Sequence, residues 1–127
     1  MASASSRITV PKFTSMKAEG RKISMLTAYD HAMAELVDSA GVEGVLVGDS
    51  LSMVVQGHVN TLPVTLDEMI YHAEMVGRAV KNALVIVDMP FPSFHLGCSK
   101  AIENAARIIK ETRCRPSSSR VVWPRLG

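Results

Sequence analysis

The sequence lacks the features of several classes of protein. It has no run of about 20 apolar residues, so no membrane-spanning helix is predicted. Cys98 and Cys114 do not have metal-site spacing and are too few for a disulfide scaffold, so a reducing, cytoplasmic location is expected. Aromatic residues make up only 5%, and the basic residues are scattered over a chain of net charge +2. No nucleic-acid-binding surface is therefore predicted.

Residues 1–20 are predicted to be an N-terminal leader outside the folded domain. The segment MASASSRITVPKF is rich in serine and carries Arg7 and Lys12 before any acidic residue, so a transit peptide is one interpretation. Its apolar stretch is too short for a secretory signal, and a disordered leader agrees better with the pattern.

After the leader, strand-like and helix-like segments alternate three times. The predicted strands are residues 22–28, 45–47 and 83–87, and the predicted helices are residues 32–40, 66–80 and 99–110. Gly41 is placed to end the first helix, and Thr65 with Glu68 forms a predicted capping box at the start of the second. This alternation is typical of parallel strands with right-handed crossovers, in an open doubly wound sheet or in a (β/α)8 barrel.

Polar side chains follow the predicted strands, where both architectures bind their ligands. Thr27 and Asp30 follow the first strand, Asp49 and Ser50 the second (VLVGDS), and Asp88 the third (VIVDMP). Two carboxylates in one cleft repel each other, and a Mg²⁺ ion removes the conflict because it prefers carboxylate oxygens. Alternatively, Asp49 and Ser50 cap a turn or a helix. The residues alone leave both interpretations open.

Two other patterns have weaker functional meaning. His58 and His72 are candidate acid or base groups, but a single histidine near a helix is more often a structural hydrogen-bonding residue. The stretch GVEGVLVG lacks the G-x-G-x-x-G pattern before a helix, so no dinucleotide site is predicted.

Three stretches resemble the ketopantoate hydroxymethyltransferase family, also called 3-methyl-2-oxobutanoate hydroxymethyltransferase. They are KISMLTAYDHAMA, VLVGDSLSMVVQGHVNTLPVTLDEMIYH and VIVDMPF. The resemblance covers roughly residues 21–112, and the order VGDSL, QGH, TLPVT, DMPF is specific. It implies a (β/α)8 TIM barrel, of which these residues form about the first three βα units, and a homo-oligomer.

The resemblance also implies an activity in pantothenate and coenzyme A biosynthesis. The family moves a one-carbon unit from 5,10-methylenetetrahydrofolate to 3-methyl-2-oxobutanoate and gives 2-dehydropantoate. By match of motif, Asp49 and Asp88 are magnesium ligands, and Asp49, Ser50 and Asp88 hold the 2-oxo acid. Chelation by Mg²⁺ makes the adjacent C–H acidic, and the metal-stabilised enolate attacks the folate-borne carbon. The family's general base lies beyond the matching residues, so no catalytic residue is assigned in this chain.

Residues 113–127 depart from the family pattern. The family continues into a fourth strand resembling Q-A-V-K-L-E-G-G-V-A, with a substrate-binding Lys and a magnesium-associated Glu, whereas this chain reads RCRPSSSRVVWPRLG. Codons for Arg115 to Leu126 can be chosen so that, with a preceding C and a shift back by one base, they read Q-A-V-K-L-E-G-G-V-A-E-A. A single-base frameshift just before Arg115 is therefore predicted.

The consequence for the chain is an incomplete barrel. We expect the third strand to be an exposed edge, apolar helix faces to be uncovered, and the chain to self-associate or aggregate and to have little or no transferase activity. Two alternatives stay open. One is a related magnesium-dependent 2-oxo acid carbon–carbon lyase, which the block from VGDSL to TLPVT disfavours. The other is a non-catalytic binding fragment.

Overall fold

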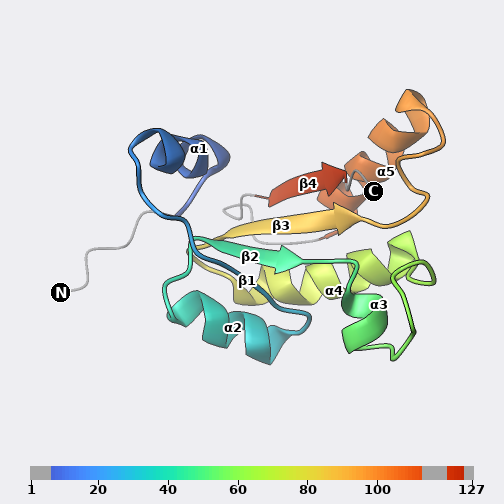
Figure 1. Cartoon of the computed structure of the whole chain (residues 1–127), viewed down its shortest axis with the longest axis horizontal. Helices are drawn as coiled ribbons and strands as arrows, with labels where there is room; N and C mark the ends of the chain where they lie inside the picture. The colour runs from blue at the N-terminus through green and yellow to red at the C-terminus, as the bar shows by residue number, and fades with distance from the viewer. Residues whose placement is uncertain (1–6, 113–119, 125–127) are drawn as a thin grey trace.

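The computed structural model describes residues 7–112 and 120–124, which form a four-stranded sheet flanked by helices (Figure 1). In chain order the elements are α1 (Val10–Ala18), β1 (Met25–Thr27), α2 (His31–Ser39), β2 (Gly44–Val47), α3 (Leu51–Val54), α4 (Leu66–Ala79), β3 (Leu84–Met89), α5 (Cys98–Glu111) and β4 (Arg120–Pro124). The predicted strands and long helices are thus present, with ends that differ by a few residues.

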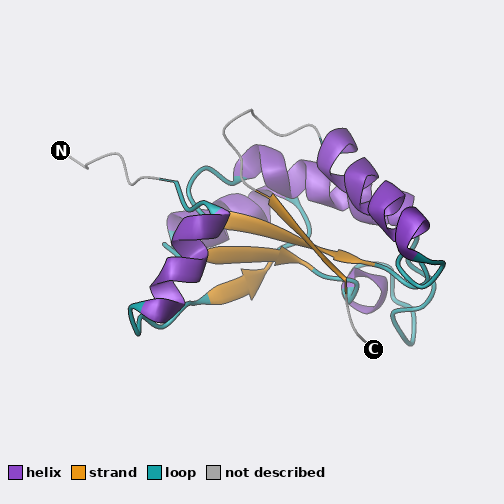
Figure 2. Cartoon of the chain, turned by 90° about the horizontal axis from the view of Figure 1, so that it is seen from above, coloured by secondary structure: helices purple, strands orange, loops and turns teal. Residues whose placement is uncertain are grey.

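The four strands lie in the order β1-β2-β3-β4, and each neighbouring pair is parallel. Helices α2, α4 and α5 lie along one side of the sheet, and α1 lies against its other side (Figure 2). Consecutive parallel strands joined by helices on one face are the repeating unit of the (β/α)8 barrel, which confirms the predicted α/β class.

Strand side chains alternate between the two faces of the sheet. Val45 and Val47 of β2, and Val85 and Val87 of β3, are fully buried in the core shared with the helices. Leu46 and Ile86 are only partly buried and line a cleft on the opposite face. That opposite face is the one that lines the interior when such a sheet closes into a barrel.

Helix α4 confirms the predicted capping box. The hydroxyl of Thr65 accepts the backbone N–H of Glu68 at 3.1 Å, and the Glu68 carboxylate accepts the backbone N–H of Thr65 at 3.0 Å. These bonds satisfy two groups that a helix start leaves without intrahelical partners. Met69, Ala73 and Val76 then form the buried face of the helix.

A buried carboxylate joins α2 to the start of β3. Asp38 is only 6% exposed and accepts backbone N–H groups from Lys81, Asn82 and Ala83, at 2.9 Å from Lys81 and 2.8 Å from Ala83. Because these three N–H groups bind one carboxylate, Asp38 connects α2 to the residues that lead into β3.

The expectation of a disordered leader is wrong for residues 10–18, which form α1. Thr9 caps this helix by accepting the N–H of Lys12 at 3.3 Å, and Pro11 lies in its first turn, where a missing N–H costs nothing. The side chain of Met16 is buried, and the N–H of Ile8 donates to the carbonyl of Asn82 at 2.8 Å. Residues 1–6 of the predicted leader lie outside the described residues.

The expectation that the third strand is an exposed edge is also wrong. β4 pairs with β3 in parallel from Val85↔Arg120 to Met89↔Pro124. The short strand-like stretch at Val121 to Trp123 is enough to form a strand, because β3 offers backbone N–H and C=O groups along its whole length for pairing. Residues 113–119 of the predicted non-family tail, where the frameshift is predicted, and residues 125–127 lie outside the described residues.

Apolar side chains are exposed near both edges of the sheet, as expected for part of a barrel. Leu26 on β1 and Leu36 on α2 are 52% and 64% exposed, and Ile102 on α5 is 70% exposed. Within the described part of the chain, no helix has the length and apolar character needed to cross a membrane.

Candidate active site

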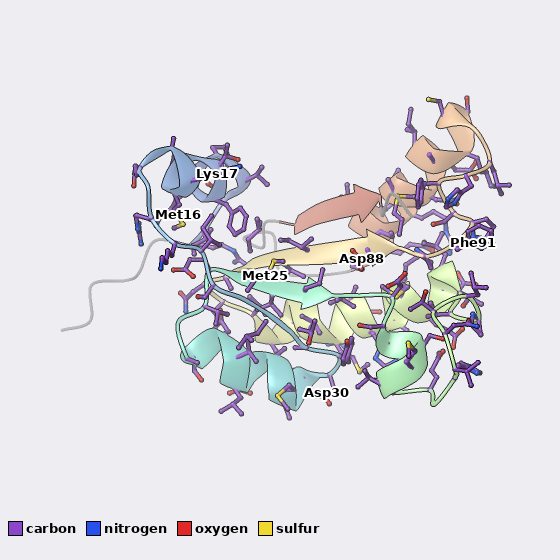
Figure 3. All side chains as sticks on the ribbon, viewed as in Figure 1. Met16, Lys17, Met25, Asp30, Asp88 and Phe91 are labelled. Atoms are coloured by element: carbon purple, nitrogen blue, oxygen red, sulfur yellow. The ribbon has the colours of Figure 1, made fainter. Side chains whose placement is uncertain are left out.

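A cleft of about 600 Å³ lies on the inner face of the sheet, at the carboxyl ends of β2 and β3. Gly48, Asp49, Ser50 and Asp88 form its polar side, so the structure brings the three predicted site residues together. Its apolar side consists of Phe13, Met25, Leu46 and Ile86. Figure 3 shows Asp88 at the carboxyl end of β3, and Met25 toward the other end of the sheet.

The two aspartates are buried, and a hydrogen bond from the backbone of Asp49 to the side chain of Asp88 connects them. Asp49 is 6% exposed and Asp88 is 9% exposed. The backbone N–H of Asp49 donates to Oδ2 of Asp88 at 3.3 Å, across two neighbouring strands. This bond orients the Asp88 carboxylate toward the turn that follows β2.

Gly48 provides the space in which the polar groups meet. A Cβ added at this position would lie 3.3 Å from both Oδ2 of Asp88 and Oγ of Ser50. A larger residue here would therefore crowd the two side-chain oxygens that approach this point. The sequence analysis did not assign Gly48 a role, although it stands beside Asp49 in the VGDS motif.

Ser50 is held by a second hydroxyl. Its Oγ lies 2.6 Å from the hydroxyl of Tyr29, which follows β1. Ser50 occupies the N-cap position of α3, but its side chain makes no capping hydrogen bond. The capping interpretation is thus wrong for the hydroxyl of Ser50.

The other polar candidates have structural positions. Nδ1 of His72 lies 2.6 Å from the carbonyl oxygen of Tyr29 and must donate to it, because a carbonyl only accepts. Asp30 caps α2 by accepting the N–H of Met33 at 2.8 Å. His58 is exposed, and neither it nor Thr27 is among the residues that line the cleft.

A smaller cavity of about 280 Å³ adjoins the site on the other side of Asp49. Phe91, Phe94 and His95 contribute to its lining, and the ring of His95 lies 4.9 Å from that of Phe91 and 4.0 Å from that of Phe94. Figure 3 shows Phe91 in the loop beyond β3. The sequence analysis missed this aromatic group because its members become neighbours only through the turn after β3.

Asp49 and Asp88 are the two carboxylates among the residues that line the cleft. Among the residues that the structure describes, no set of three histidine, cysteine, aspartate or glutamate side chains is grouped to hold a metal. A metal bound here would therefore take its other ligands from water, from substrate or from other parts of a complete barrel.

Comparison with known proteins decides the family. The family model described as ketopantoate hydroxymethyltransferase matches residues 7–116. The chain belongs to this family. The 3-methyl-2-oxobutanoate hydroxymethyltransferase of Rhodopirellula baltica is 54% identical over 109 residues, which are 86% of this chain and 40% of that protein. The enzyme of the same name from Flavobacterium johnsoniae is 56% identical over 106 residues, which are 84% of this chain and 39% of that protein.

The chain thus spans about 40% of the length of the curated hydroxymethyltransferases that it matches. The family match begins at residue 7, within the segment predicted as a leader, which agrees with the helical structure of α1.

Solved structures share the fold at low sequence identity. A phosphoenolpyruvate phosphomutase from Streptomyces platensis subsp. rosaceus has a TM-score of 0.65 at 15% identity, over 82% of this chain and 35% of that one. A 2,3-dimethylmalate lyase of the PEP mutase/isocitrate lyase superfamily has a TM-score of 0.58 at 19% identity, over 83% and 38%. A phosphonopyruvate hydrolase in complex with oxalate and Mg²⁺ has a TM-score of 0.54 at 11% identity, over 92% and 53%. These likenesses concern the fold alone, so they give the lyase alternative no support beyond architecture.

Proposed function

We propose that the described residues form the metal-binding and oxo-acid-binding part of a 3-methyl-2-oxobutanoate hydroxymethyltransferase. The reaction moves a one-carbon unit from 5,10-methylenetetrahydrofolate to 3-methyl-2-oxobutanoate, gives 2-dehydropantoate and belongs to pantothenate biosynthesis. The observation that carries the proposal is the cleft shared by Asp49, Ser50 and Asp88 in a chain of this family.

The residues of the cleft fit Mg²⁺. Asp49 and Asp88 would hold the ion, since Mg²⁺ binds through one or two carboxylates and keeps other positions for water and substrate oxygens. When bound, Mg²⁺ would polarise the keto group and make the adjacent C–H more acidic.

The protein groups act by position and burial. The N–H of Asp49 holds the Asp88 carboxylate in place, and the burial of both aspartates reduces solvent screening in the cleft. The hydroxyl of Ser50, which lines the cleft, would donate a hydrogen bond to the carboxylate of the 2-oxo acid. The apolar side of the cleft, which includes Leu46 and Ile86, suits the branched carbon chain of the same substrate.

We propose further that this chain does not complete the reaction by itself. The resemblance places the general base, the lysine and the additional glutamate in the part of the family that this chain does not match. Without a base, the C–H of the bound acid keeps its proton. We also propose a cytoplasmic location, which the absence of a disulfide pattern in the sequence supports.

A chimera tests the function. Residues 7–112 of this chain would replace the aligned segment of the Rhodopirellula baltica enzyme, and formation of 2-dehydropantoate would be measured with and without methylenetetrahydrofolate. We expect folate-dependent product from the chimera and none from the 127-residue chain alone. Asp49→Asn and Asp88→Asn should each lower activity about 100-fold or more, because changes merely behind a metal ligand already cost 10–100-fold.

The control is Asp67→Asn, since Asp67 is 79% exposed and pairs with Arg107 on the surface. Full activity in the Asp49→Asn and Asp88→Asn chimeras would refute the proposed site. Cleavage of a 2-oxo or 2-hydroxy acid without folate would indicate the lyase instead.

A further inference from the structure

Tyr29 reaches the candidate site from a neighbouring strand. It follows β1, and its hydroxyl lies 2.6 Å from Oγ of Ser50, which follows β2. The side chain of Tyr29 packs against the hydrophobic core, so its ring is held by contacts away from the hydroxyl. Ser50 is among the residues that line the 600 Å³ cleft and Tyr29 is not, so Tyr29 meets the cleft through Ser50.

The backbone of Tyr29 is fixed by a third element. Nδ1 of His72, on α4, donates to the carbonyl oxygen of Tyr29 at 2.6 Å. The same helix is anchored at its start by the Thr65 and Glu68 capping box and packs its apolar face on the sheet. The position of the Tyr29 hydroxyl is therefore set by α4 and the core together.

We infer that Tyr29 is a positioning residue that aims the Ser50 hydroxyl at the carboxylate of the 2-oxo acid. This inference rests on the proposed function, since it concerns how Ser50 holds that substrate. A carboxylate only accepts hydrogen bonds, so the single O–H of Ser50 donates its hydrogen bond to the substrate. The Ser50 oxygen then accepts the proton of the Tyr29 hydroxyl, which fixes one of the three staggered positions of the serine side chain.

A double-mutant cycle in the chimera, which supplies the rest of the barrel, tests the inference. Wild type, Tyr29→Phe, Ser50→Ala and the double variant would be titrated with 3-methyl-2-oxobutanoate at constant Mg²⁺ and followed by NMR. Tyr29→Phe should weaken binding about three- to tenfold, the usual effect of one lost hydrogen bond. In the Ser50→Ala background, Tyr29→Phe should change nothing further, because both changes remove the same interaction.

Tyr71→Phe is the matched control, since Tyr71 is 62% exposed on α4 and loses the same hydroxyl. Binding of Mg²⁺ alone should be the same in wild type and Tyr29→Phe, which excludes a general loss of structure. Equal affinity of wild type and Tyr29→Phe for the acid would overturn the inference. An equal loss in the wild-type and Ser50→Ala backgrounds would also overturn it, because Tyr29 would then act independently of Ser50.

The Asp49→Asn variant separates this inference from the proposed function. If binding of the acid depends on Mg²⁺ and is lost in Asp49→Asn but is unchanged in Tyr29→Phe, the inference alone is overturned. Absence of Mg²⁺-dependent binding in the wild-type chimera would overturn the proposed site and, with it, the role of Tyr29.

Discussion

At the scale of single residues, the candidate site depends on Gly48, which leaves space for its polar groups to approach one another. Asp88 and Ser50 come from different strand ends, and their side-chain oxygens approach the same point beside Gly48. Asp49 contributes both a carboxylate and the backbone N–H that binds Asp88. A residue without a side chain is thus as much a part of the site as the residues that carry the chemistry.

Gly48→Ala tests this arrangement. The added methyl group would lie 3.3 Å from Asp88 Oδ2 and Ser50 Oγ, closer than ordinary contact distance, so both oxygens must move. We expect the affinity for Mg²⁺ with 3-methyl-2-oxobutanoate to fall about tenfold, a cost of about 1.4 kcal/mol. Isothermal titration of the chimera measures it. Gly57→Ala would not serve as a control, because Gly57 has a positive φ and an added side chain would strain its backbone. The control is Ala83→Gly, which changes one methyl group at a residue that does not line the cleft. Unchanged affinity in Gly48→Ala would contradict the account.

Some of these residues could be predicted from the sequence and others could not. Asp49, Ser50 and Asp88 were found because parallel strands bring their carboxyl ends to one edge. The contacts of Tyr29 with Ser50 and of Asp38 with residues 81–83 depend on side-chain rotamers and on packing between distant segments. No pattern of apolar and polar residues specifies such contacts.

At the scale of elements, the ends of α4 were predicted best because their signals are local. Thr65 and Glu68 are three residues apart, and each meets the backbone of the other. Helix α3 was missed since four residues give no periodicity, and α1 was missed because its serine-rich surroundings resemble a leader. β4 was missed as a strand because its pairing with β3 is a tertiary contact.

The capping box makes stability depend on pH. The backbone N–H of Thr65 binds the Glu68 carboxylate and lowers its pKa below the ordinary value of 4.5. A lowered pKa stabilises the folded state above pH 4.5, and this stabilisation is lost as the pH falls through the lowered value. Glu68→Gln keeps a hydrogen-bond acceptor at the same place but has no charge, so this pH-dependent stabilisation should be absent at every pH.

Urea unfolding between pH 7 and pH 3 measures this effect. We expect the free energy of unfolding of wild type to exceed that of Glu68→Gln by about 0.5 kcal/mol at pH 7, since the carboxylate is near solvent. The difference should shrink as the pH falls below 4.5 and through the lowered pKa of Glu68. A difference that stays constant over this range would contradict the assignment, because an uncharged effect of the side chain does not titrate.

At the scale of the whole molecule, the sheet has the order and direction of a barrel but only four strands among the described residues. The family match and the solved structures confirm the barrel architecture, of which the chain covers a part. The alternation of strands and helices predicted parallel strands in either an open doubly wound sheet or a barrel, and the resemblance to the family indicated the barrel. The sequence did not predict that residues 120–124 would extend the sheet beyond β3.

The uncovered apolar surface should cause self-association. Leu36 on α2 is 64% exposed and Leu26 on β1 is 52% exposed, and apolar surface of this kind is normally covered by a neighbouring element. Sedimentation velocity of the 127-residue chain should show oligomers that grow with concentration. Leu36→Glu should shift the distribution toward the monomer, because a buried charge without a partner opposes association.

Val59→Glu is the control, since Val59 is 90% exposed in the loop between α3 and α4. The same shift in Val59→Glu would indicate an effect of net charge rather than of the α2 surface. A monomer at all concentrations in wild type would contradict the prediction.

The central claim is that Asp49 and Asp88 bind a divalent cation together with a 2-oxo acid. Mn²⁺, a paramagnetic substitute for Mg²⁺, would be added to the isotope-labelled chain with 3-methyl-2-oxobutanoate. The account predicts selective broadening of the amide signals of Gly48, Asp49, Ser50 and Asp88, its loss in Asp49→Asn and Asp88→Asn, and its reversal by EDTA. Broadening that is spread over exposed carboxylates, or that persists in both variants, would contradict the claim.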